Sequence, residues 1–232
     1  MDIYEGQNLI DCVKQYSGVP LQKNITYTVS EKVSDDIRGY LVFNGNWHFY
    51  KKNQYSSAEG HKKKLALVLE SPHKDEYRIN KVLQRTPNNG TLIPQRPANG
   101  FAGNQIDHFI QNRPWIKHLS TSNIYEVFIM NAIQYQCSAY DYIQGMKKTV
   151  RRLTDAIFLV MWNNTKTGTT HFQSDFANRI KRYSPDVIIN ACTKGTCVPN
   201  LQMKVANVIG NMASDFYAID YHPANPRRFR WR

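Results

Sequence analysis

The sequence has no long apolar run and no basic or apolar leader, and these absences exclude several classes of protein. Its longest apolar runs, such as Leu65–Leu69 and Ala156–Trp162, are far shorter than the roughly 20 residues that a membrane helix needs. The first residues have neither the basic segment nor the apolar segment of a secretory signal. We therefore expect a cytoplasmic protein that binds no membrane.

Close cysteine pairs and phosphate-binding loops are also missing. The four cysteines, Cys12, Cys137, Cys192 and Cys197, form no C-x-x-C pair, from which zinc and iron–sulfur sites usually take ligands. We expect four free thiols, no metal and no other cofactor. Because there is no G-x-G-x-x-G or Walker loop, a nucleotide-handling enzyme of the Rossmann or flavodoxin type is disfavoured.

Acidic residues are scarce relative to basic ones. The 232 residues include 30 lysines and arginines against 18 aspartates and glutamates, which gives a formal net charge of +12. A positive field of this size attracts polyanions and speeds their encounter with the protein. Together with the aromatic content of 12%, the charge predicts a nucleic-acid ligand, DNA or RNA. We also expect a monomer.

From residue 61 onward, short apolar runs alternate with segments of helical spacing. The expected strands are Leu65–Leu69, Glu126–Ile133, Asp186–Ala191 and Phe216–Asp220. The expected helices are Gln105–Gln111, about Tyr142–Trp162, Asp175–Tyr183 with Ser174 as its N-cap, and Leu201–Met212. This alternation predicts an α/β fold, with helices on both faces of a mainly parallel four-stranded sheet in a three-layer α/β/α arrangement.

Residues 1–60 have a different pattern and are predicted to form an N-terminal elaboration on a catalytic domain of residues 61–232. A short helix is expected over Asn8–Tyr16. The stretch Gly39–Lys52 is expected to form a β-hairpin that turns at Asn44-Gly45-Asn46. A loop rich in proline, glycine and asparagine is expected over Thr86–Gly103.

Polar side chains follow the ends of the four expected strands. Glu70 follows the first, Asn131 lies near the end of the second, Asn190 lies near the end of the third, and His222 follows the fourth. Parallel sheets place their binding sites at the carboxyl ends of the strands. We therefore expect an acid, amides and an imidazole to meet at one edge of the sheet.

Four segments at these strand ends resemble motifs of the uracil-DNA glycosylase superfamily, in its bacterial branches without iron–sulfur cysteines. Glu70-Ser71-Pro72 followed by Asp75-Glu76 resembles the first motif, and Pro97-x-x-Gly100-x-Ala102-Gly103-x-x-Ile106-Asp107 resembles a second conserved segment. Asn131 is similar to the asparagine that reads the flipped base. His222-Pro223 with Arg227-Arg228 resembles the closing motif, whose loop enters the minor groove. The resembling region runs from Leu65 to Arg228, about 70% of the chain.

The resemblance implies an enzyme that flips a base out of DNA and hydrolyses its N-glycosidic bond, leaving an abasic site. It implies catalytic roles for Glu70, Asp75 and His222. The implied base-binding residues are Ser71, Pro72, His73, Ala98, Phe101 and Asn131, and the implied DNA-binding residues are Lys74, Arg227, Arg228 and Phe229.

The chain departs from the family pattern at several of these positions. Leu69 and His73 replace glycines of the first motif, and Ser71 stands where some relatives carry a catalytic aspartate. The aromatic residue that stacks on uracil falls on Ala98. The departure favours a base larger than uracil, such as the glucosylated hydroxymethylcytosine of phage DNA, unless Phe101 or Tyr77 supplies the ring.

Two other functions stay open. Pro185-Asp186 resembles the start of a metal-dependent nuclease motif, although no acid-x-Lys follows on the neighbouring strand. A non-catalytic DNA-binding module with the same fold is the second alternative. Asp75 and Glu76 could also be simple carboxylates at a helix N-terminus, where the helix dipole favours negative charge. The target base, the preference for single or double strands, and a role in repair or in phage defence are left undetermined by the sequence.

Overall fold

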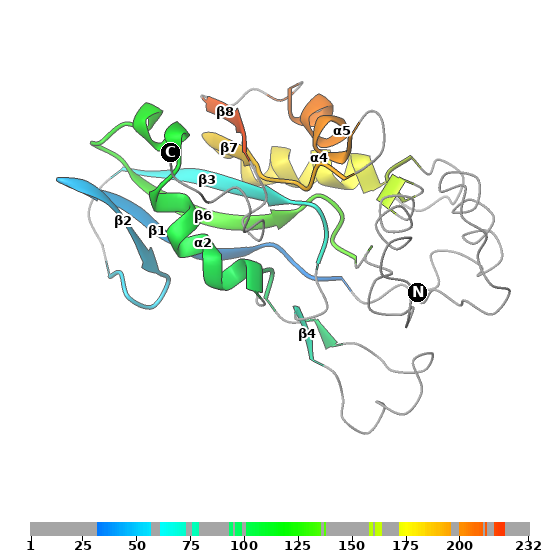
Figure 1. Cartoon of the computed structure of the whole chain (residues 1–232), viewed down its shortest axis with the longest axis horizontal. Helices are drawn as coiled ribbons and strands as arrows, with labels where there is room; N and C mark the ends of the chain where they lie inside the picture. Colours follow the sequence, from blue (N-terminus) through cyan, green and yellow to red (C-terminus); the bar gives the residue numbers. More distant parts are fainter. Residues whose placement is uncertain are drawn as a thin grey trace, which may run out of the picture.

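A six-stranded sheet forms the centre of the protein in the computed structural model (Figure 1). The structure describes residues 32–56, 61–72, 76–78, 93–94, 96–98, 101–135, 137, 158–159, 161–163, 172–195, 200–210, 212 and 216–220. The strands of the sheet are β1 (Asp36–Asn44), β2 (Asn46–Lys51), β3 (Lys62–Leu69), β6 (Ile124–Asn131), β7 (Val187–Asn190) and β8 (Phe216–Ile219). The other elements are the short ladder of β4 (Tyr77–Arg78) with β5 (Ile93–Pro94), the 3-10 helix η3 (Pro114–His118), and the helices α2 (Phe101–Gln111), α4 (Phe172–Tyr183) and α5 (Leu201–Ile209).

The four strands predicted from the sequence form the parallel part of this sheet. The strand order is β2-β1-β6-β3-β7-β8, and β6, β3, β7 and β8 run parallel to one another. Residues Leu65–Leu69 of β3 have at most 2% of their surface exposed. Both faces of β3 are therefore covered, which explains why this strand is a continuous apolar run without alternation.

The predicted number of four strands is too small, because the N-terminal hairpin belongs to the same sheet. β1 pairs antiparallel with β6, and β2 pairs antiparallel with β1 as the outermost strand. The turn lies at Gly45, whose φ of +73° is a conformation that glycine adopts without a steric penalty. The hairpin was expected as an addition to the sheet, but its hydrogen bonds make it two strands of that sheet.

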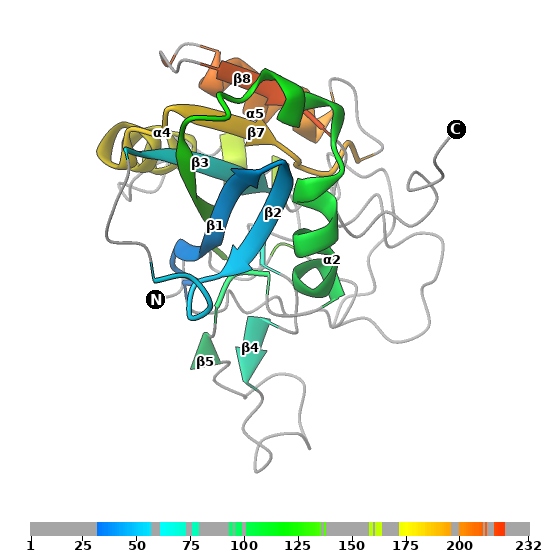
Figure 2. The same cartoon turned by 90° about the vertical axis from the view of Figure 1, so that its left-hand side faces the viewer.

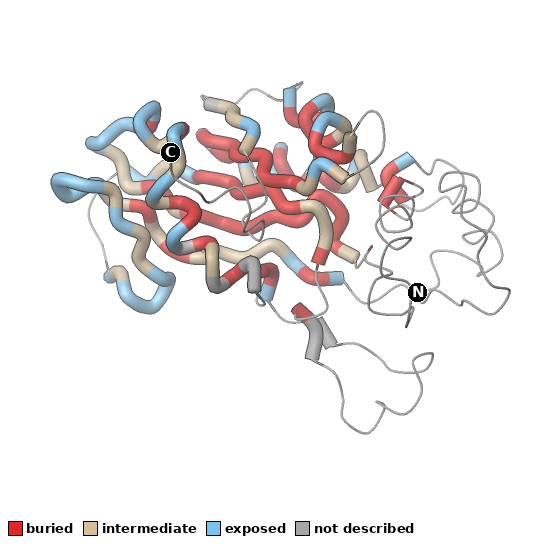
Figure 3. Tube along the Cα trace, viewed as in Figure 1, coloured by how far each residue is buried: buried red, intermediate tan, exposed pale blue. Residues whose placement is uncertain are grey.

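Helices cover both faces of the sheet, which confirms the predicted α/β class. Ile106, Phe109 and Ile110 of α2 pack with alternate residues of β3 and β6 such as Leu67 and Ile129. Helices α4 and α5 pack on the opposite face, and Figure 2 shows α2 and α4 on the two sides of the strands. The buried residues concentrate in the central strands between these layers (Figure 3).

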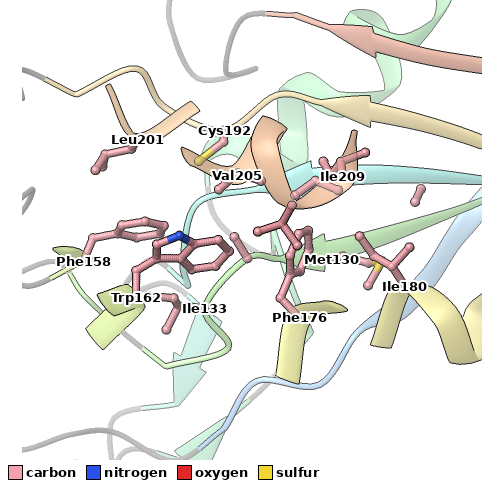
Figure 4. Close-up of a cluster of buried hydrophobic side chains, with 14 of the residues drawn as sticks. Met130, Ile133, Phe158, Trp162, Phe176, Ile180, Cys192, Leu201, Val205 and Ile209 are labelled. Carbon is pink, nitrogen blue, oxygen red and sulfur yellow. The ribbon is translucent and has the colours of Figure 1, made fainter. Parts of the chain in front are cut away.

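Aromatic packing fixes the layer that contains α4 and α5. The rings of Phe158 and Trp162 stack with centroids 5.4 Å apart, and Trp162 lies 5.8 Å from the ring of Phe176 in α4 (Figure 4). Such ring pairs contribute about 0.5–1.5 kcal/mol each beyond the area that they bury. The contacts anchor this part of the predicted segment Tyr142–Trp162, of which only residues 158–159 and 161–162 are described and helical.

Two helix starts differ from the prediction. α2 begins at Phe101, within the expected loop Thr86–Gly103. α4 begins at Phe172 and not after Ser174, since the ring of Phe172 packs edge-on against Tyr135, 5.6 Å away, and extends the helix toward its N-terminus.

Helix α5 ends before the predicted Met212, at Ile209, where Gly210 caps it by donating its N–H to the carbonyl of Ala206. Its start agrees with the prediction, with the side chain of Asn200 accepting from the backbone N–H of Met203. The expected helix Asn8–Tyr16 lies outside the described residues. None of the described helices is long and apolar enough to cross a membrane.

Candidate functional site

The carboxyl ends of β3 and β6 lie side by side and bring two predicted site residues together. Leu69, the last residue of β3, pairs with Asn131, the last residue of β6. The pairing continues past the sheet, because the N–H of Ala132 donates to the carbonyl of Leu69 at 2.8 Å and that of Ile133 to the carbonyl of Glu70 at 3.0 Å. Glu70 and Asn131 are therefore held at one edge, as the sequence predicts for parallel strands.

Asn131 is a buried amide with one open hydrogen-bonding group. Only 1% of its surface is exposed, and its Nδ2 donates to Oε2 of Glu76 at 3.3 Å. Its Oδ1 is also buried and has no hydrogen-bond partner in the part of the chain that the structure describes. A buried acceptor left unpaired costs about 1–3 kcal/mol, so this oxygen is suited to accept a hydrogen bond from a bound ligand.

Glu76 is the site residue that the sequence reasoning missed. In the sequence it belongs with the first motif or with a helix N-terminus and has no predicted site role, but the structure buries it to 3% exposure beside Asn131, 55 positions along the chain. A carboxylate can only accept from an amide, so Glu76 fixes the nitrogen of Asn131 on its own side and leaves Oδ1 on the other. The nearest sequence signal is its place just after the Glu70-Ser71-Pro72 motif.

Glu70 and Ser71 lie next to a buried thiol. Both residues are partly exposed, whereas Pro72 and Cys137 are buried. Burial raises the pKa of Cys137 well above its ordinary value; the charge of Glu70 raises it further, and a hydrogen bond with Ser71 opposes the rise. The thiol is therefore neutral at ordinary pH, which makes it an inert neighbour of Glu70.

A buried ion-pair network supports the end of β6 from the side of α4. Arg179 of α4 is 3% exposed and donates through Nη2 to the carbonyls of Asn131 at 2.9 Å and Ala132 at 3.1 Å. The same guanidinium binds both carboxylate oxygens of Asp35, at 2.9 and 3.2 Å, and Oδ2 of Asp175 at 2.8 Å. Arg179 therefore positions the backbone that carries Asn131, a role that the sequence did not indicate.

The ends of β7 and β8 are held by a second set of buried amides. Nε2 of Gln202 donates to the carbonyls of Asn190, at 3.3 Å, Cys192, at 3.0 Å, and Asp220. Nδ2 of Asn190 donates to the carbonyl of Gln202 at 2.9 Å, and its Oδ1 accepts from the N–H of Cys192 at 3.1 Å. Unlike Asn131, Asn190 has both polar atoms bonded within the protein, so it is a structural residue.

Ala98 has no exposed surface through which to touch a base. It packs in the core cluster beneath α2 and has a φ of +53°, which is strained for a residue with a Cβ. Its carbonyl presses on Gly103, where an added Cβ would lie 1.5 Å from that oxygen. The glycine of the resembling segment is thus required here by a close backbone approach.

Several predicted site residues fall outside the described residues. Asp220, the last described residue of this segment, lies beside the end of β7, because its N–H donates to the carbonyl of Asn190 at 2.9 Å. Those outside the description are His73, Lys74, Asp75, His222, Arg227, Arg228 and Phe229, together with the side chain of Phe101.

Asp186, the carboxylate of the nuclease alternative, lies at the amino end of β7, at the other end of the strands from Glu70 and Asn131. Asp186 precedes β7, accepts from the N–H of Lys64 at 2.8 Å and pairs with Nζ of Lys63 at 3.7 Å. It is separated from Asn190 by about 13 Å of strand, at about 3.3 Å per residue. Across the described ranges, no three histidine, cysteine, aspartate or glutamate side chains gather closely enough to hold a metal ion.

Comparison of the chain with protein-family models, curated proteins and solved structures finds no match. These comparisons assign the chain to no family, and the resemblance to the uracil-DNA glycosylases stays a prediction.

Proposed function

We propose that this protein is a DNA glycosylase that binds an extruded base at the carboxyl ends of β3 and β6 and hydrolyses its N-glycosidic bond. The observation that carries the proposal is the buried Oδ1 of Asn131, which has no partner among the described residues, at the strand end beside Glu70. An extruded base presents N–H donors that such an acceptor can read.

The roles follow from the chemistry of N-glycoside hydrolysis. The C1′–N bond breaks, its electron pair leaves with the base, and the sugar develops an oxocarbenium-like charge. Glu70, at the edge and partly exposed, is suited to stabilise that cation and to take a proton from the water whose oxygen bonds to C1′. His222 is proposed to donate the proton that the departing base acquires.

Glu76 supports base reading by orienting the amide of Asn131. Because its carboxylate accepts from Nδ2, the amide oxygen is presented to the ligand and the nitrogen is not. The site therefore favours a base that offers a donor at this position. Because Ala98 is buried in the core, its small side chain gives no ground for choosing a base larger than uracil, and the choice of base is an outcome of the experiment.

The decisive experiment incubates the purified protein with duplex and single-stranded DNAs that carry uracil, glucosylated hydroxymethylcytosine or unmodified bases, in the presence of EDTA. Mild alkali then cleaves the strand wherever a base has been removed. Strand cleavage after alkali, and none before it, is the expected result. Cleavage that needs a divalent metal and no alkali would instead support the nuclease alternative.

Variants separate catalysis from simple DNA binding. We expect Glu70→Gln to lower the rate by roughly 10²–10⁴-fold, which is typical for the loss of an acid–base group. Asn131→Leu removes the base-reading amide and should also abolish detectable removal. Asn112→Leu, at an exposed amide after α2, is the control and should keep the parent rate. DNA binding without an abasic site on any substrate would support the non-catalytic module.

A further inference from the structure

A cavity of about 300 Å³ opens beside the start of β1, and nothing in the proposed mechanism uses it. The turn after β2 and the segment at residues 96–97 form its other walls. Its lining includes the cationic side chains Arg38, Lys51, Lys52 and Arg96, the carboxylate of Asp36, and Ile129 of β6. We call it the basic cavity, and we infer that it binds a phosphodiester group of the DNA strand whose base is held at Asn131.

The balance of charge in the basic cavity selects an anion. Among the described residues that line the cavity, four side chains are cationic and one, that of Asp36, is a carboxylate. Asp36 lies 3.6 Å from Nζ of Lys52 and 3.8 Å from Nε of Arg96, so it is shared between two cations. Lys52, Arg96 and Arg38 together carry more positive charge than the one carboxylate of Asp36 offsets. This excess attracts a phosphate, and the volume has room for a phosphate with its adjoining sugar.

Arg38 is built into the cavity wall. It is the extra residue of a β-bulge, because the pairing of β1 with β6 shifts between Ile37 and Gly39. Bulges re-aim side chains beside binding sites. Nη2 of Arg38 donates to the carbonyl of Gly103 at 2.9 Å, which fixes the guanidinium. Its Nε is buried without an acceptor among the described residues, and a phosphate oxygen would supply one.

The basic cavity lies close enough to Asn131 for one DNA strand to occupy both. Ile129 lines the cavity and precedes Asn131 by two residues on the same face of β6, about 7 Å along the strand. A phosphate held there would place the backbone next to the extruded nucleotide. The identity of the ligand as a DNA strand rests on the proposed function, whereas its negative charge rests on the cavity alone.

The test is the salt dependence of DNA binding, measured by fluorescence anisotropy with an oligonucleotide that has no terminal phosphate. Each lost phosphate contact reduces the slope of log K against log[NaCl] by about 0.7–0.9. We expect this reduction for Arg96→Gln and for Lys51→Gln, with weaker binding to every sequence. Both side chains lie on exposed residues, so the variants should fold. Lys181→Gln, at the exposed end of α4, is the matched control and should keep the parent slope.

Two further measurements separate the possible outcomes. A mononucleotide with a 5′-phosphate should compete for the cavity more weakly than an oligonucleotide; stronger competition by the mononucleotide would overturn the assignment to a backbone phosphate. Parent slopes in Arg96→Gln and Lys51→Gln, or an equal loss in Lys181→Gln, would overturn it as well. Reduced slopes without abasic-site formation would keep the basic cavity and reject the glycosylase, and abasic-site formation with unchanged slopes would do the reverse.

Discussion

Replacing Arg179 by methionine should lower the free energy of unfolding by about 3–5 kcal/mol, the usual cost of removing one partner of a buried ion pair. Arg179 is 3% exposed and gives two hydrogen bonds to Asp35, one to Asp175 and two to backbone carbonyls at the end of β6. The variant would leave the buried carboxylate of Asp35 with Gln134 as its remaining bonded partner among the described residues. For a chain of this size the melting temperature should fall by about 6–20 °C.

The loss should depend on pH in a defined direction. Burial raises the pKa of Asp35 above its ordinary value, although Arg179 opposes the rise. A carboxyl group whose pKa is higher in the folded than in the unfolded protein stabilises the fold when it is protonated. This contribution to the free energy of unfolding is complete below the pKa of the unfolded state, and it is lost as the pH rises through the pKa of the folded state. Without Arg179 the pKa rises further, so Asp35 stays neutral to a higher pH. The loss in free energy of unfolding caused by Arg179→Met should therefore be smaller at about pH 4.5 than at pH 7.

Urea unfolding of the parent, Arg179→Met, Asp35→Asn and the double variant measures these effects. Asp35→Asn should recover part of the loss, with a coupling energy of about 0.5–3 kcal/mol. Arg182→Met, on an exposed turn of the same helix, is the control and should change stability by no more than about 0.5 kcal/mol. A deficit below about 1 kcal/mol, or equal deficits at both pH values, would refute the reasoning.

Three further predictions concern backbone conformation and thiol reactivity. Gly103→Ala should destabilise the protein by about 1–3 kcal/mol in thermal melts, because its Cβ would collide with the carbonyl of Ala98; a neutral result would mean that this approach is looser. Ser184→Gly should stabilise it by roughly 0.5–1 kcal/mol, since Ser184 ends α4 with a φ of +46°, and a lower melting temperature would contradict this. Cys137 is buried and has a raised pKa, so it should not react with iodoacetamide until the protein unfolds. Labelling of Cys137 in the folded protein, detected by mass spectrometry, would contradict this prediction.

The parts of the fold that could be predicted are those whose burial follows from the local pattern of apolar residues. β3 and β7 were predicted to within three residues because parallel strands covered on both faces are short apolar runs. β8 was also predicted, to within one residue, although it is an outermost strand of the sheet and Ile219 is 48% exposed. β6 was placed two residues too late, since Ala132 and Ile133 continue its apolar pattern after the chain has left the sheet but stay buried. The same apolar run fits any inner position, so the strand order could not be predicted.

The candidate site was predictable only where it lies on strand ends. Glu70 and Asn131 meet because the ends of parallel strands share an edge, which needs no knowledge of side-chain packing. The contact of Glu76 with Asn131, and that of Arg179 with Asp35, join segments 55 and 144 positions apart through loops and helix packing. A carboxylate or guanidinium of this kind has no local pattern that distinguishes a buried partner from an exposed charge.

The antiparallel hairpin also has a consequence for how the chain is made. β1 ends at Asn44 and its partner β6 begins at Ile124, 80 positions later. At typical synthesis rates of about 5–20 residues per second, roughly 4–16 s pass between the synthesis of β1 and that of β6, the strand that pairs with it. During that interval its aromatic side chains, among them Trp47 and Phe49, lack the core against which they later pack. Newly made chains are therefore most exposed to mutual pairing through this hairpin, and slow translation of residues 45–123 should increase their dependence on chaperones.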